Sequence, residues 1–229
     1  LNLFTMEMHK QFYYHYLDFL NNDNAKVAVV TGAGEHFSAG DDLKESDTPL
    51  KSRDKPRWDE LIINHRRTKP MIAAINGWCL GQGILYTLLM TDIRIAGNSA
   101  RFGFPEIAYG MGGISGATRL AIQIPAVAAA YMALTGEKID AQQAKEYFIV
   151  NEVTNDSDSL PRAMEIACKI AGHPLIAIET ELDGLHRGTE LSRSAALQYA
   201  LGQYINQRKL HLAAGHSAIS DLKANKDNS

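Results

Sequence analysis

Apolar residues recur at nearly every fourth position over the first twenty residues of the chain. The series consists of Phe4, Met8, Phe12, Tyr16 and Leu20. This spacing lines up one face of a helix, so it predicts an amphipathic helix from Leu3 to about Leu20. The polar run Asn21-Asn22-Asp23-Asn24 is typical of a helix end.

Two short apolar runs, 26–31 and 71–75, predict buried strands. A small-residue run follows each of them: Phe37-Ser38-Ala39-Gly40-Asp41-Asp42-Leu43 after the first, and Asn76-Gly77-Trp78-Cys79-Leu80-Gly81-Gln82-Gly83 after the second. Either run alone is typical of a plain turn. Together they predict two tight turns that leave parallel strands and aim free backbone N–H groups at one point. Two such groups aimed at one oxygen would form an oxyanion hole.

The rest of the pattern divides the chain by type of element. A buried helix is predicted at 83–90 and short strands at 93–96 and 100–103, whereas from Gly116 onward the pattern is mostly helical. The predicted helices there cover 117–122, 126–134, 141–147, 160–171, 174–185 and 191–210. Strand-helix units followed by helices indicate an α/β domain with a helical C-terminal region. We place the division between residues 1–125 and 126–229.

Composition and charge limit the classes of function. The 229 residues are 45% hydrophobic, enough to bury a core as one domain or as a domain with a helical tail. The net charge of −3 argues against a nucleic-acid partner, and we interpret the basic cluster His65-Arg66-Arg67 as a solvated helix end. Cys79 and Cys168 are too few for a disulfide framework, and no signal peptide or membrane-spanning run is evident. We therefore expect a cytoplasmic protein without a membrane or metal partner.

Longer stretches of the chain follow one family pattern. Lys69-Pro70 precedes the second strand, Asp92-Ile93-Arg94-Ile95-Ala96 follows it, and Phe102-Gly103-Phe104-Pro105-Glu106 comes next. In this order the chain resembles the enoyl-CoA hydratase/isomerase family, the crotonase superfamily. The resemblance implies ββα turns wound into a spiral, with C-terminal helices that pack a homotrimer, often paired into a hexamer. It also implies that N-terminal strands of the family precede Leu1, and that the divergent end at 216–223 alters how the nucleotide part of CoA is covered.

The resemblance further implies an acyl-CoA thioester as substrate, with coenzyme A as part of it and no tightly bound cofactor. The N–H of Asp41 would be the first oxyanion donor. The second would be Gln82 if counted from Asn76-Gly77, or Gly83 if counted back from Asp92, because this chain has one residue more between those landmarks than most relatives. We prefer Gln82, since a helix N-terminus already has free N–H groups.

Family hydratases place two glutamates around the reacting carbons, and only one is present here. Glu106 matches the second, whereas Leu85, or Tyr86 in the other alignment, takes the place of the first. One base with an oxyanion hole suffices for double-bond migration, so we expect an enoyl-CoA isomerase. A tyrosine that held water would leave an enoyl-CoA hydratase as the alternative. A weakly catalytic CoA-ester-binding or assembly protein of the same fold is a third interpretation.

Four further residues are candidates for substrate contact by their position in the family pattern. The backbone of Ala39 lies where the adenine of CoA is bound, and Lys44 lies where relatives place a cation near its phosphates. Trp78 and Met111 are candidates for the acyl pocket, although large apolar residues are as often plain core.

Overall fold

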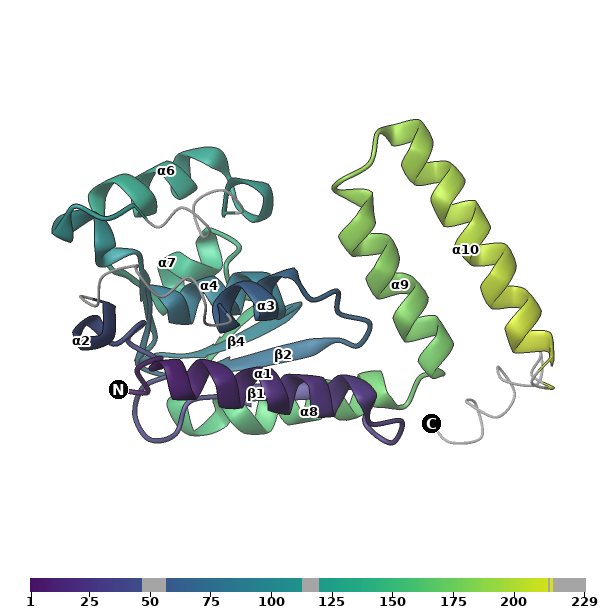
Figure 1. The fold of residues 1–229 in the computed structure, drawn as a ribbon, viewed down its shortest axis with the longest axis horizontal. Coiled ribbons are helices and arrows are strands. Elements are labelled where there is room, and N and C mark those ends of the chain that lie inside the picture. The colour runs from purple at the N-terminus through teal and green to yellow at the C-terminus, as the bar shows by residue number, and fades with distance from the viewer. Residues whose placement is uncertain (47–56, 113–119, 214, 216–229) are drawn as a thin grey trace. The chain divides into compact units, whose positions relative to one another are not determined.

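The computed structural model describes residues 1–46, 57–112, 120–213 and 215 (Figure 1). The chain divides into two compact units, Leu1–Lys169 and Ile170–Ser229, and each is described by itself. The predicted helix at 117–122 lies largely outside the described residues.

A parallel sheet of four strands is the centre of the first unit. Its strands occur in the order β1 (Ala28–Thr31), β2 (Met71–Ile75), β4 (Ile93–Gly97) and β7 (Glu152–Thr154). All five residues of β2 are buried, because a strand covered on both faces must be apolar throughout. The neighbouring parallel strands β1 and β2, expected from sequence, are confirmed.

A second sheet contains β3 (Trp78–Leu80), β5 (Arg101–Gly103) and β6 (Ile139–Asp140), with β5 parallel to β3 and antiparallel to β6. The prediction of a single tight turn over 76–83 was therefore wrong, since this run contains β3. Residues 78–80 extend because they pair with β5 and because Ser38 forms an isolated bridge with Cys79. The prediction that the chain is mostly helical beyond Gly116 also did not include β6 and β7.

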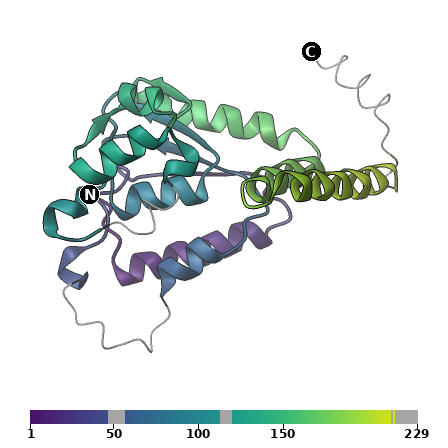
Figure 2. The ribbon, with the colours of Figure 1, turned by 90° about the horizontal axis from the view of Figure 1, so that it is seen from above.

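Helices surround these sheets in the first unit. They are α1 (Met6–Asn21), α2 (Leu43–Ser46), α3 (Trp58–Asn64), α4 (Gln82–Met90), η1 (Pro105–Tyr109), α6 (Ala126–Thr135), α7 (Ala141–Glu146), η2 (Asp156–Asp158) and α8 (Ser159–Ala171). α1 begins later than predicted because Phe4 donates its N–H to the Gly40 carbonyl (2.9 Å), which keeps the chain extended up to the cap at Thr5. α1 and α3 lie side by side (Figure 2).

α4 lies between two hydrophobic clusters. Its Ile84 and Leu88 belong to the larger cluster, which includes Phe102 and Ile139 from the second sheet. Its Tyr86 and Met90 belong to the smaller one, together with Phe4, Tyr16, Ile62 and Met71. Packing on both sides fixes the helix whose first residue is the candidate donor Gln82.

The basic cluster His65-Arg66-Arg67 is not simply a solvated helix end. Arg67 is buried and its guanidinium binds the Asp92 carboxylate through two contacts, of 2.5 and 2.6 Å. Asp92 also accepts the Met71 N–H at 2.9 Å. This pair therefore joins the segment after α3 to the starts of β2 and β4.

The second unit is a helical hairpin of α9 (Leu175–Gly188) and α10 (Arg193–Ala213), which confirms the helical C-terminal region (Figure 1). Tyr199 and Gln203 of α10 hydrogen-bond to Asp183 of α9. In the part of the chain that the structure describes, none of the helices has both the length and the apolar character needed to cross a membrane.

Candidate active site

The first small-residue run leaves one backbone donor free. Gly40 has a φ of +98°, which favours glycine, and its carbonyl accepts the Phe4 N–H. The Asp42 N–H in turn donates to the Phe4 carbonyl at 3.1 Å. Between these two bonds, the N–H of Asp41 makes no hydrogen bond among the described residues. The turn thus presents the Asp41 N–H as an unsatisfied donor.

The second run ends β3 and begins α4 at Gly81, whose φ is +53°. The first N–H groups of a helix have no acceptor within it, so Gln82 and Gly83 both offer donors. A Cβ added to Gly40 would lie 3.4 Å from the Gln82 nitrogen, whereas one added to Gly83 would lie 2.9 Å from the Ser38 Cβ. Gln82 therefore adjoins the Gly40-Asp41 turn, which favours it over Gly83 as the second donor.

Glu106 brings a carboxylate to the same place. Pro105 begins η1, and a Cβ added to Gly81 would lie 2.8 Å from the Glu106 Oε1 atom. Glu106 Oε2 is buried and has no hydrogen-bond partner among the described residues. Burial raises the pKa of Glu106, and the negative charge of Asp41 raises it further, although a backbone hydrogen bond acts in the opposite direction. A half-buried carboxyl group that has a raised pKa and one oxygen without a hydrogen-bond partner can accept and donate a proton.

Hydrocarbon lies on the face of α4 that Glu106 approaches. Leu85 is buried and donates its N–H to Gly81 at 3.0 Å, so both residues lie on that face. Tyr86, one residue further, instead packs with Phe4 in the smaller cluster. Leu85 therefore fits the position of the absent second glutamate better than Tyr86 does.

A buried histidine that sequence analysis did not single out joins this region. His9 of α1 lies 2.6 Å from the Tyr86 hydroxyl through Nδ1 and 3.2 Å from Asp41 Oδ1 through Nε2. The available signal was its place in the sequence, three residues before Phe12 and seven before Tyr16, on the apolar face of the helix. The Asp41 side chain thus turns toward α1, as expected for a carboxylate that would repel a developing oxyanion.

The four predicted substrate-contact residues have other surroundings. Ala39 donates its N–H to the Leu1 carbonyl at 2.9 Å, and Lys44 is exposed on α2. The Trp78 ring stacks on His36 at 5.0 Å, whereas Met111 is exposed and donates its N–H to the Glu106 carbonyl at 3.1 Å. Their roles toward a substrate stay predictions, whereas Asp41, Gln82 and Glu106 lie together.

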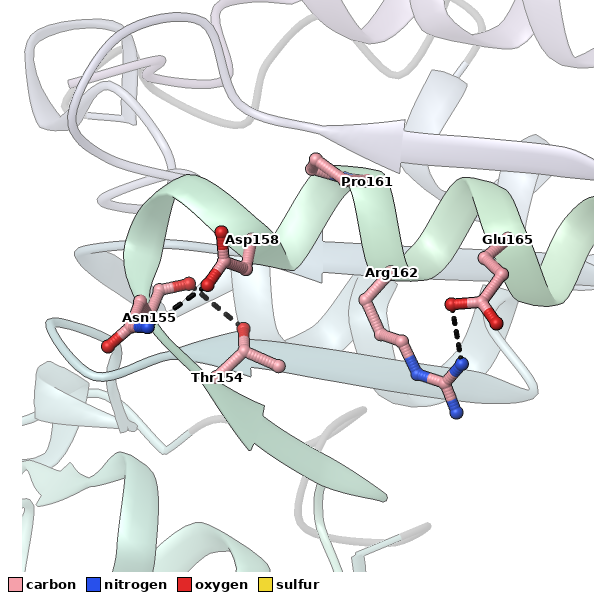
Figure 3. A pocket seen from close by; sticks show the side chains of 6 residues that line it. All are labelled: Thr154, Asn155, Asp158, Pro161, Arg162 and Glu165. Atoms are coloured by element: carbon pink, nitrogen blue, oxygen red, sulfur yellow. Dashed lines mark hydrogen bonds and ion pairs between the residues drawn. The ribbon is translucent and has the colours of Figure 1, made fainter.

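A surface pocket on β7, η2 and α8 is separate from this group (Figure 3). It is lined by Thr154, Asn155, Asp158, Pro161, Arg162 and Glu165. Arg162 binds Glu152 at 2.8 Å and Glu165 at 2.7 Å, so its charge is already compensated. In the described ranges no group of three or more His, Cys, Asp or Glu side chains could hold a metal ion.

Comparison with known proteins identifies the family of this chain. The family model described as enoyl-CoA hydratase/isomerase matches residues 1–212. The chain is 31% identical to mevalonyl-coenzyme A hydratase of Aspergillus fumigatus over 86% of its own length and 74% of that protein. It is 37% identical to 2,3-dehydroadipyl-CoA hydratase of Escherichia coli over 75% of its own length and 68% of that protein.

Solved structures with a similar fold have the same kinds of names as these relatives. The enoyl-CoA hydratase of Bacillus anthracis superposes with a TM-score of 0.86 at 29% identity, covering 98% of this chain and 87% of that one. A putative enoyl-CoA hydratase/isomerase of Mycobacterium abscessus gives a TM-score of 0.83 at 29% identity, covering 99% and 87%. The chain therefore belongs to the enoyl-CoA hydratase/isomerase family, the crotonase superfamily, whose enzymes act on CoA thioesters.

Proposed function

We propose that this enzyme moves a proton next to the carbonyl of an enoyl-CoA thioester and thereby shifts its double bond. The observation that carries the proposal is the grouping of a half-buried carboxylate, Glu106, with the free N–H groups of Asp41 and Gln82. Leu85 supplies no second carboxylate on the same face of α4. The site therefore has one proton carrier and an acceptor for negative charge.

The backbone donors would bind the thioester oxygen. When a base removes a proton from carbon 2 of a 3-enoyl thioester, the electron pair of that C–H bond delocalises onto this oxygen. Hydrogen bonds from Asp41 and Gln82 become stronger as the charge develops, so they stabilise the enolate more than the substrate.

Glu106 would serve as both base and acid. Its ionised carboxylate takes the proton from carbon 2, and the resulting acid delivers a proton to carbon 4 as the enolate collapses. The double bond then lies between carbons 2 and 3, in conjugation with the carbonyl. No proton or electron pair is gained or lost, so one carboxyl group completes the cycle.

Hydration of a 2-enoyl thioester is the second candidate, and the names of the relatives favour it. The similar proteins from Aspergillus fumigatus and Escherichia coli are both named as hydratases. Glu106 would have to orient the attacking water and handle its proton. A CoA-ester-binding or assembly role without turnover remains an outcome of the test rather than a proposal.

The test compares both reactions in one purified preparation. We expect isomerisation of a 3-enoyl-CoA to exceed hydration of the 2-enoyl-CoA of equal chain length. Glu106→Gln should lower isomerisation by at least about two orders of magnitude, the low end for a general base. Glu146→Gln, at an exposed position of α7, is the matched control and should change turnover little.

The outcomes separate the interpretations. Faster hydration that depends on Glu106 would favour the hydratase, and turnover that survives Glu106→Gln would refute the role of this residue. CoA-ester binding without either reaction would favour the binding protein.

We further propose a homotrimer, or a hexamer of two trimers, in the cytoplasm. The exposed apolar residues of α10 support association, and the two free cysteines, Cys79 and Cys168, suit a reducing compartment.

A further inference from the structure

We propose that His9 is a positioning residue that holds the two oxyanion donors at their working separation. This inference rests on the proposed function. Among the described side chains, His9 alone hydrogen-bonds to both Asp41 and Tyr86. Asp41 carries the first donor, and Tyr86 lies one turn after Gln82, the second donor, on α4. A single imidazole therefore links the two donor segments from a third element, α1.

The direction of the two hydrogen bonds follows from their acceptors. An ionised Asp41 carboxylate can only accept, so His9 Nε2 carries the proton and donates to it. When the ring is neutral, Nδ1 is then an acceptor, and the Tyr86 hydroxyl donates to it. Burial raises the pKa of Tyr86, which keeps that hydroxyl protonated. The tautomer is thus fixed by the two neighbours.

The side chain of Gln82 lies next to the hydrogen-bonded series of Asp41, His9 and Tyr86. This side chain lies close enough to the Tyr86 hydroxyl to lower the pKa of that group, partly opposing the effect of burial. Gln82 Nε2 is buried and makes no hydrogen bond of regular geometry among the described residues. A small movement would let it donate to the Tyr86 oxygen, whose own proton points to His9. The polar series would then run from the side chain of one donor residue to that of the other.

Packing holds the imidazole in this orientation. The Phe4 ring stacks on His9 with centroids 5.1 Å apart and meets Tyr86 edge-on at 4.9 Å. The Phe4 backbone bonds to Gly40 and Asp42, on either side of the first donor. His9 therefore cannot turn away without disturbing the donor turn itself.

The experiment uses substitutions on one helix and two readouts. His9→Leu removes both bonds, and His15→Leu, at an exposed position of α1, is the matched control. Turnover of a 3-enoyl-CoA gives kcat and KM. The infrared carbonyl band of bound hexanoyl-CoA, labelled with ¹³C at the thioester carbonyl, reports polarisation by the oxyanion donors without turnover.

Misplaced donors should weaken transition-state stabilisation more than binding. We expect His9→Leu to lower kcat by about ten- to a hundredfold, as small misplacements do, with KM within about twofold. The carbonyl band should return toward its frequency in free hexanoyl-CoA. His9→Gln should recover much of kcat, because its amide can donate to Asp41 and accept from Tyr86.

A second variant tests the link itself. Tyr86→Phe should also lower kcat. The double variant His9→Leu/Tyr86→Phe should have a kcat little below that of the worse single variant, because both substitutions interrupt the same chain of hydrogen bonds. If His9→Leu fails to fold, Tyr86→Phe and His9→Gln still decide the matter. Turnover and a carbonyl band in folded His9→Leu equal to those of His15→Leu would overturn the proposal.

The proposed function fails by different results. If the wild-type protein catalyses neither reaction, or if Glu106→Gln keeps its turnover, the function is wrong whatever His9 does. A different outcome refutes only the positioning role. In that case Glu106→Gln is inactive and the wild-type carbonyl band shifts on binding, but Tyr86→Phe and His9→Leu both keep the wild-type kcat and carbonyl band.

Discussion

Glu106 has the surroundings that a proton carrier at neutral pH needs. Burial disfavours its ionised form, and the nearby Asp41 carboxylate acts in the same direction. A carboxylate whose pKa is raised in this way is a stronger base than an exposed glutamate. Burial and the Asp41 charge therefore lead to a prediction about the pH dependence of turnover.

Proton abstraction requires ionised Glu106, so kcat/KM should fall as the pH drops through its pKa. Because that pKa is raised, the midpoint of this acid limb should lie above about 4.3, the ordinary value for glutamate. Asp41→Asn removes a negative charge but keeps the backbone donor and an oxygen for His9. It should therefore move the limb to lower pH, as a pH series of kcat/KM for both proteins would show.

An acid limb at the ordinary glutamate value would contradict the effect of burial. A limb that stays in place in Asp41→Asn would instead leave burial as its cause and remove Asp41 from the explanation.

Sequence alone could single out Glu106, Asp41 and Gln82 as candidates because a short motif places each beside a recognisable strand or helix end. It could not single out His9, whose partners Asp41 and Tyr86 are 32 and 77 residues away. The choice between Leu85 and Tyr86 also needed coordinates. Adjacent helix positions face directions about 100° apart, and only packing shows that Tyr86 belongs to the smaller hydrophobic cluster.

At the scale of elements, the strands and helices with strong apolar patterns were predictable. β2, α1 and α4 have such patterns, whereas β3, β6 and β7 have only two or three residues each. Strands this short are stabilised by pairing with distant partners rather than by local preference. The pairing of β3 with β5 therefore converts what looked like one turn into a strand followed by a turn.

The Arg67–Asp92 pair gives a prediction at this scale. Arg67→Met should leave the Asp92 carboxylate partly buried without its counter-charge, so the free energy of unfolding should fall by roughly 3 kcal/mol. Chemical denaturation measures this change. Lys145→Met, at an exposed position of α7, is the control and should stay within about 0.5 kcal/mol.

Equal effects of the two substitutions would show that the buried ion pair does not stabilise the strand starts. A loss at Arg67 that Asp92→Leu relieves in the double variant would instead identify the Asp92 carboxylate, deprived of the Arg67 charge, as the cause.

At the scale of the whole molecule, α10 has no buried residue and exposes large apolar side chains along one side. Leu197, Leu201, Tyr204, Ile205 and Leu212 are spaced by four, three, one and seven residues, which places them on one side of the helix. The α9-facing side carries Tyr199 and Gln203, which bond to Asp183. The apolar stripe therefore lies away from α9, and an apolar stripe of this size commonly marks a protein–protein interface.

Burial of this stripe between copies would stabilise the trimer or hexamer that we propose. Leu201→Glu/Ile205→Glu should lower the mass measured by light scattering, because charges would have to be buried in the interface. Asn206→Glu, exposed and about 150° from the middle of the stripe, is the control and should keep the wild-type mass. A wild-type protein that is monomeric across working concentrations would contradict the proposal. A mass unchanged by the double variant would place the interface elsewhere.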